Sequence, residues 1–190
     1  MDRRLVAAFA AFAILTSGAV AQTAPDAQVE IGRGENREAE LAGRVADAEQ
    51  FIGIAEVGNQ FEIQSSQIAL EKAQSAEVKA FAQMMITDHT AASQKLAAVI
   101  EAANIPVVPP NNIDTGSAEK MEDIQTVTTD QFDRMYLRWQ IQSHQVSVAL
   151  FTSYAENGDN EQLKQFAAEM LPSLQAHLDH AGQLNAGIAQ

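Results

Sequence analysis

Two stretches of the chain, 26–105 and 111–171, contain no proline and repeat apolar residues at helical spacing. In the first stretch these residues recur at alternating steps of three and four, which is typical of the buried face of a helix. The pattern predicts one helix over 46–73 and, with Ser75 as its N-cap, a second helix that ends near Asn104. Because the turn between them is tight, we expect an antiparallel hairpin.

The second half of the chain predicts a long crossover followed by another helix. Prolines and polar residues over 104–129 interrupt the pattern but leave room for a short helix that starts at Ser117. Thr128 and Gln131 have the spacing of a capping box, so the next helix is expected to begin there. Its apolar face ends at 157–158, an Asn-Gly pair that is typical of helix ends.

A fourth helix is predicted after this turn, with Asp159 and Gln162 as its capping pair. Pro172 lies inside the helix, where it removes one backbone donor. We therefore expect a kink there and a released carbonyl at Ala168.

An internal repeat relates the two halves of the chain. The octapeptides 78–85 and 163–170 align without a gap, and each follows a turn and a helix cap. Two helical hairpins, neither thick enough to bury its own apolar face, are thus joined by one long crossover. This order predicts an all-α fold, a ferritin-like four-helix bundle with a short helix in the crossover.

The N-terminus has the pattern of a secretory signal peptide. Arg3 and Arg4 precede an apolar run over 5–15, and small residues at 19 and 21 form a cleavage site. The run is shorter than the roughly 20 residues that a membrane-spanning helix needs, and no later segment is longer. We expect cleavage after Ala21 and export to the periplasm.

The pattern divides the chain into three parts: a signal peptide over 1–21, a flexible polar leader over 22–47 and a bundle domain over 48–190.

The formal charge is −13, which argues against nucleic acids and acidic membranes as partners because both require clustered Lys and Arg. No cysteine is present, so disulfides, thiolate metal sites and thiol catalysis are excluded. Another envelope protein or a second copy of the chain is the expected partner.

Three of the four histidines, His89, His144 and His177, fall on predicted inward faces of three different helices. Counting from the turns at about 1.5 Å per residue places His89, His144 and Glu62 at one level, with His177 one turn deeper. With Asp88 nearby, this layer has the ligands of a site for copper, iron or zinc, and the soft sulfur of Met85 would favour copper.

The same residues allow other interpretations besides a mononuclear metal site. Di-iron bundles carry Glu three residues before His, but Ile86, Ile141 and Leu174 occupy those positions here. A di-iron site is therefore not expected. We favour a buried polar network in which the histidines are structural, with a mononuclear metal site second and catalysis third.

Several segments resemble the family catalogued as domain of unknown function 4142, over about residues 48–188. The resemblance lies in 51–69, in 78–89 with its Asp-His pair, and in the Leu-Pro-x-Leu-x-x-His-Leu ending over 171–178. The matching motif positions are Asp88, His89, Asp133, His144, Pro172 and His177. The resemblance implies a ferritin-like, exported bacterial protein, and it implies no agreed activity or metal.

These observations predict a non-enzymatic envelope or stress-associated protein without a firmly assigned cofactor. The alternative is a metal-binding or redox bundle that holds one transition-metal ion. Its candidate ligands are Glu62, Asp88, His89, His144 and His177.

Overall fold

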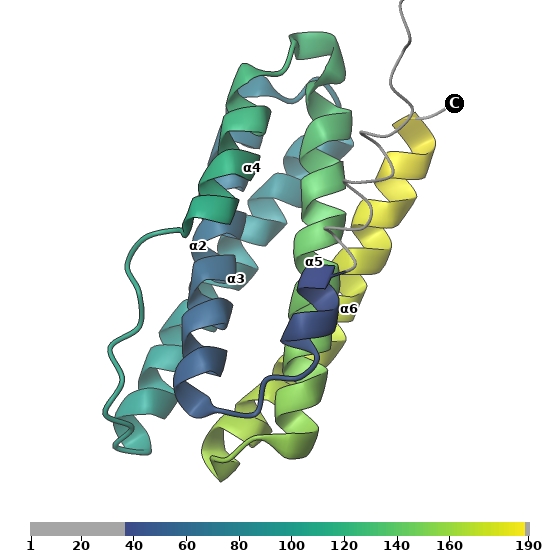
Figure 1. Cartoon of the computed structure of the whole chain (residues 1–190). Helices are drawn as coiled ribbons and strands as arrows, with labels where there is room; N and C mark the ends of the chain where they lie inside the picture. Colours follow the sequence, from purple (N-terminus) through teal and green to yellow (C-terminus); the bar gives the residue numbers. More distant parts are fainter. Residues whose placement is uncertain (1–36, 189–190) are drawn as a thin grey trace, which may run out of the picture.

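The computed structural model describes residues 37–188, and every regular element in that range is helical (Figure 1). After a short helix over 37–42, the elements are α2 (Ala48–Lys72), α3 (Ala76–Ala102), α4 (Thr115–Thr126), a 3₁₀ turn η1 (Thr129–Gln131), α5 (Phe132–Asn157) and α6 (Glu161–Ile188). The all-helical prediction is confirmed. The predicted signal peptide lies outside the described residues. Within 37–188, no helix has an apolar stretch long enough to cross a membrane.

The helices form two hairpins, α2 with α3 and α5 with α6, and α2 also packs on α5 and α3 on α6. The carboxylate of Asp133, at the start of α5, accepts hydrogen bonds from the backbone N–H groups of Gln74 and Ser75 at 2.9 and 2.8 Å. At the opposite end, the N–H of Asp159 donates to the carbonyl of Ala46. The connection from α3 to α5 therefore runs the length of the bundle, and α4 within it packs against α2 and α5 (Figure 1).

Helix starts agree with the predictions only in part. Ser75 caps α3 as expected, since its hydroxyl accepts from the N–H groups of Glu77 and Val78. The crossover helix α4 begins two residues before the expected Ser117, at Thr115, with Asp114 as its cap.

Two predicted caps are wrong. Thr128 makes no capping hydrogen bond, because the 3₁₀ turn lies between it and α5. Asp159 does not cap α6 either. Its carboxylate accepts from the hydroxyl of Tyr154, and Asn160 instead accepts from the N–H of Leu163.

Gly158 ends α5 at the predicted place but for a different reason. Its φ is −60°, so no left-handed conformation is needed. A Cβ atom there would lie 2.5 Å from the ring of Tyr154, which is fully buried and stacks on Phe51 at 4.1 Å between ring centroids. Glycine is required because it leaves room for this ring.

The described part of the predicted leader packs on the bundle. Ala42 and Val45 are buried in the apolar cluster near the α5–α6 turn, and the hydroxyl of Ser153 donates to the carbonyl of Val45. In Figure 1 the short helix over 37–42 lies in front of α5. Residues 22–36 lie outside the described residues.

The core consists of two apolar clusters with a polar layer between them. One cluster surrounds Phe51 and Phe166 near the α5–α6 turn, and the other surrounds Phe81 and Tyr136 near the α2–α3 turn. The layer between them contains buried polar residues: Asn59, Glu62, Ser65, Ser66, His89, Gln140, His144 and His177. The candidate chemistry of the sequence therefore lies at the middle of the bundle.

Candidate metal centre

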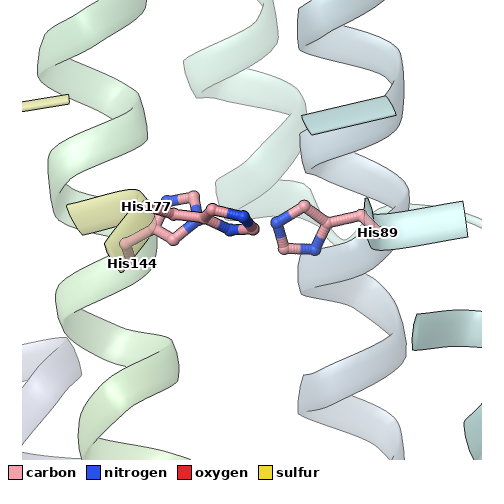
Figure 2. A group of neighbouring side chains, drawn as sticks. All are labelled: His89, His144 and His177. Atoms are coloured by element: carbon pink, nitrogen blue, oxygen red, sulfur yellow. The ribbon is translucent and has the colours of Figure 1, made fainter. Parts of the chain in front are cut away.

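His89 of α3, His144 of α5 and His177 of α6 meet in this polar layer, with their rings directed at one another (Figure 2). The ring centroids are 5.3–5.6 Å apart, and one nitrogen from each ring lies within 4.8 Å of the other two. No more than 4% of any of these residues is exposed. Three helices thus bring three buried imidazoles together.

Each imidazole is held by a hydrogen bond on the side away from the cluster. The Nδ1 atom of His144 donates to the backbone carbonyl of Gln140 at 2.8 Å. The Nε2 atom of His177 donates to the carboxylate of Asp88 at 2.9 Å. Because a carbonyl and a carboxylate only accept, these contacts fix the N–H on the outer nitrogen of both rings.

The third ring, His89, has its Nδ1 atom 2.9 Å from the side-chain oxygen of Asn59 on α2. An amide oxygen accepts, so Nδ1 carries the proton here too. Histidines that bind metals commonly donate their second nitrogen to a carboxylate or carbonyl in this way.

The inner nitrogens are Nε2 of His89, Nε2 of His144 and Nδ1 of His177. Each is buried and has no hydrogen-bond partner among the described residues. Burial lowers the pKa of His144 to about 4 and that of His89 well below its ordinary value of 6.5. Burial, followed by the charge of His144, also lowers the pKa of His177. At neutral pH all three rings are uncharged, as metal ligation requires.

The spacing of these nitrogens suits a metal ion. Three atoms no more than 4.8 Å apart lie at most about 2.8 Å from a common centre, compared with about 2.0–2.1 Å for a zinc–imidazole bond. Closing the difference requires each ring to move inward by less than about 1 Å, which side-chain torsions permit. A neighbouring cavity of about 20 Å³, lined by His89, His177 and Met170 among others, has room for about one water molecule.

The two predicted carboxylate ligands lie outside this triangle. Asp88 is 40% exposed and contacts the outer nitrogen of His177. Glu62 is fully buried, with one oxygen 3.6 Å from the outer nitrogen of His144. Burial raises the pKa of Glu62 to about 7.

The structure places the other predicted residues elsewhere. Asp133 ties α5 to the α2–α3 turn, and Pro172 lies within α6, which continues past it to Ile188. Met85 is buried in the apolar cluster around Phe81. The ring of His177, expected one turn deeper, lies 5.6 Å from that of His89, compared with 5.4 Å for the ring of His144. Counting residues ignores side-chain reach and helix tilt.

Sequence reasoning did not identify the groups that orient His89 and His144. Asn59 lies on the first predicted helix beside the apolar positions that defined its inward face, and a polar residue there does not by itself indicate a histidine partner. The acceptor for His144 is a backbone carbonyl, which leaves no trace in the sequence.

Fold and site together define an all-helical protein with a buried cluster of three neutral histidines. The chain matches the family described as a domain of unknown function, DUF4142, over residues 34–184, and it belongs to that family. The resemblance inferred from the motifs is thereby confirmed. No curated protein sequence matches the chain.

Solved structures of CopM share this fold. CopM in the Cu(II)-bound form superposes with a TM-score of 0.62 at 20% sequence identity, covering 74% of this chain and 97% of that chain. CopM in the Ag-bound form gives 0.61 at 20% identity, covering 75% and 98%. The Cu(I)-bound form gives 0.60 at 20% identity, covering 73% and 95%. At this identity the likeness concerns the fold.

Proposed function

We propose that this protein binds one transition-metal ion through His89, His144 and His177. The observation that carries the proposal is the convergence of three buried, uncharged imidazoles, which bring one nitrogen each within 4.8 Å of the other two. One nitrogen of each ring also has no hydrogen-bond partner among the described residues. A buried acceptor without a partner costs about 1–3 kcal/mol, so three together are unfavourable. A bound ion would satisfy all three at once.

A purely structural role for the histidines accounts for only one of the two nitrogens of each ring. Each ring has one nitrogen in a hydrogen bond, to Asn59, Gln140 or Asp88. A network that served packing alone would be expected to use the inner nitrogens as well, since half-satisfied buried networks are unfavourable. The geometry therefore supports ligation better than the structural interpretation preferred from the sequence.

The site is suited to holding an ion rather than to transforming a substrate. The adjoining cavity of about 20 Å³ admits about one water molecule. Asn59, Asp88 and the carbonyl of Gln140 keep the rings aimed inward, and the surrounding helices exclude bulk water. We therefore propose a non-enzymatic binding protein.

Imidazole ligands suit copper, zinc, iron and nickel. Copper is the first ion to test, because CopM, which has a similar fold, has solved structures in Cu(II)-bound, Cu(I)-bound and Ag-bound forms.

Three further features are proposed with this function. The signal-peptide pattern over 1–21 supports export to the periplasm, where the protein would bind its ion. The two hairpins and the lengthwise crossover support a ferritin-like arrangement. Self-association or contact with another envelope protein remains the proposed mode of partnership.

The proposal is tested by titrating the metal-free chain with Cu(I) and, separately, with Zn(II) against a competing chelator. We expect one site per chain in the wild type and a loss of affinity of at least about 100-fold in His144→Ala. His180→Ala is the matched control, because His180 lies on α6 only three residues after His177 but its ring packs at right angles to that of Phe81 instead. Equal affinities in wild type and His144→Ala would refute the proposal.

A further inference from the structure

A second and larger cavity lies between α2, α4, α5 and the segment 37–45. Its volume is about 480 Å³, within the range of small-molecule sites. Its walls are mainly apolar and include Leu41, Ile54, Val57, Phe61 and Val146. Leu41 and Ile54 are 57% and 39% exposed, which is unusual for large apolar side chains in this structure. The cavity thus offers apolar surface that the described residues leave uncovered.

One edge of this cavity holds a carboxylate. The Nζ atom of Lys120 donates to the Oε2 atom of Glu38 at 2.8 Å, and the side-chain amide of Gln142 donates to the same oxygen at 3.2 Å. The Lys120 side chain is 17% exposed, whereas that of Glu38 is 47% exposed. The donors therefore belong to the body of the bundle, and the carboxylate reaches them from the outer segment.

Lys120 is the one cationic side chain among the residues that line the cavity. The other carboxylate there, Asp114, already accepts from the N–H of Ser117 as the cap of α4. If Glu38 moves away, the donors of Lys120 and Gln142 become free to receive another carboxylate. Lys120 and Gln142 both donate toward the position that the Glu38 carboxylate occupies, so this position is built to receive a carboxylate oxygen.

We propose that the cavity binds a medium-chain fatty acid. Its carboxylate takes the place of the Glu38 carboxylate on Lys120 and Gln142, and its acyl chain lies against Ile54, Val57 and Phe61. Burial of the chain supplies the free energy, at roughly 25 cal/mol per Å² of apolar surface. The ion pair with Lys120 selects the carboxylate. This site is independent of the histidine cluster and does not rest on metal binding.

The test is a titration of the full chain with decanoate, kept below the concentration at which it forms micelles. The fluorescence of Trp139 is the signal, since it is the single tryptophan of the sequence and Lys120 lies 5.8 Å from its ring centroid. We expect saturable binding of decanoate. Decanol and decylammonium should bind at least about tenfold more weakly, because they lack the charge that Lys120 recognises.

Four variants separate the contributions. Lys120→Met should weaken decanoate binding about tenfold, and Val57→Phe should abolish it by filling the cavity. Glu38→Gln should strengthen binding several-fold, because it removes the competing carboxylate, and this gain cannot arise from a folding defect. His144→Ala should bind decanoate as the wild type does, which keeps this result distinct from that of the metal titration.

The proposal is overturned if decanoate does not bind saturably, or if decanol or decylammonium binds as tightly as decanoate. It is also overturned if Glu38→Gln leaves the affinity unchanged, because the carboxylate of Glu38 would then not occupy the position of the ligand.

Discussion

Asp88, Asn59 and the carbonyl of Gln140 hold the three imidazoles by different chemical groups. Of the three, only Asp88 carries a charge and is reached by solvent, with 40% of its side chain exposed. Its carboxylate binds the outer N–H of His177 and so keeps the inner nitrogen in its lone-pair form. Asp88 is therefore a positioning residue that can be changed without opening the core.

Replacing this carboxylate should weaken metal binding without unfolding the protein. In Asp88→Asn we expect about tenfold lower affinity, the lower end of the range for groups that orient metal ligands. The measurement is the chelator competition described above, with circular dichroism to confirm the fold. Asp179→Asn is the control, since Asp179 is exposed on the same helix as His177 and bonds only Gln175 in the described contacts. An equal loss in both variants would show a general charge effect instead.

Glu62 should make the stability of the metal-free protein depend on pH. Burial raises its pKa from 4.5 to about 7, so the folded state favours the protonated carboxyl. The stability that this preference provides is fully present below pH 4.5 and is lost as the pH rises through about 7. Glu62→Gln stays neutral and should not suffer this loss.

Urea unfolding at pH 4.5 and at pH 8 measures the effect. Between these values the free energy of unfolding of the variant should rise relative to wild type by up to about 3 kcal/mol, at about 1.4 kcal/mol per pKa unit. Glu71→Gln is the control, because Glu71 is exposed on the same helix. A pH-independent difference for Glu62→Gln would show that its carboxyl is not buried as described.

At the scale of the helices, the turn after α5 depends on one close contact. Gly158→Ala would place a methyl group 2.5 Å from the ring of Tyr154, which cannot move freely because it is stacked on Phe51. We expect a loss of about 1–3 kcal/mol in the free energy of unfolding, as in other overpacked cores. Gly182→Ala, inside α6 with open space around it, should instead be neutral or stabilising by up to about 1 kcal/mol. Thermal unfolding of the two variants compares them, and similar effects would contradict the contact.

The sequence predicted the helices well because their apolar periodicity is long and uninterrupted. Ser75 was identified as a cap because its partners are its own neighbours in the chain. Thr128 and Asp159 were misassigned for a common reason. A capping box is a local signal. It is overridden at Thr128 by the 3₁₀ turn that follows, and at Asp159 by the hydroxyl of Tyr154, which lies 5 residues earlier and donates to the carboxylate.

The sequence predicts which histidines meet in the candidate site, but not the details of its geometry. Inward faces on three helices indicated that His89, His144 and His177 could meet, and the structure brings their rings together. Counting residues along helices did not give the level of His177, since tilt and side-chain length are tertiary properties. Which nitrogen of each ring faces inward also depends on tertiary contacts, and one of these is to a backbone carbonyl.

At the scale of the whole molecule, the cluster of three histidines joins both hairpins. His89 comes from the first hairpin and His144 and His177 from the second, and apolar clusters close the layer from both ends. An ion bound here bridges the two halves in the folded state only, so binding must raise the global stability.

This linkage predicts a measurable gain. At a free copper or zinc concentration 100 times the dissociation constant, the free energy of unfolding should increase by about 2.7 kcal/mol, as measured by urea unfolding. Mg²⁺ should give no gain, because it prefers oxygen ligands. A variant with His89, His144 and His177 all replaced by Ala should not respond to any of the three ions. A similar gain in that variant would place the ion elsewhere.

The most direct test of the central claim is elemental analysis of the untagged protein after exposure to copper or zinc and exhaustive dialysis. The three-histidine centre predicts about one ion per chain in the wild type and almost none in the variant that lacks His89, His144 and His177. A wild-type protein without metal, or a variant that retains the same amount, would contradict it.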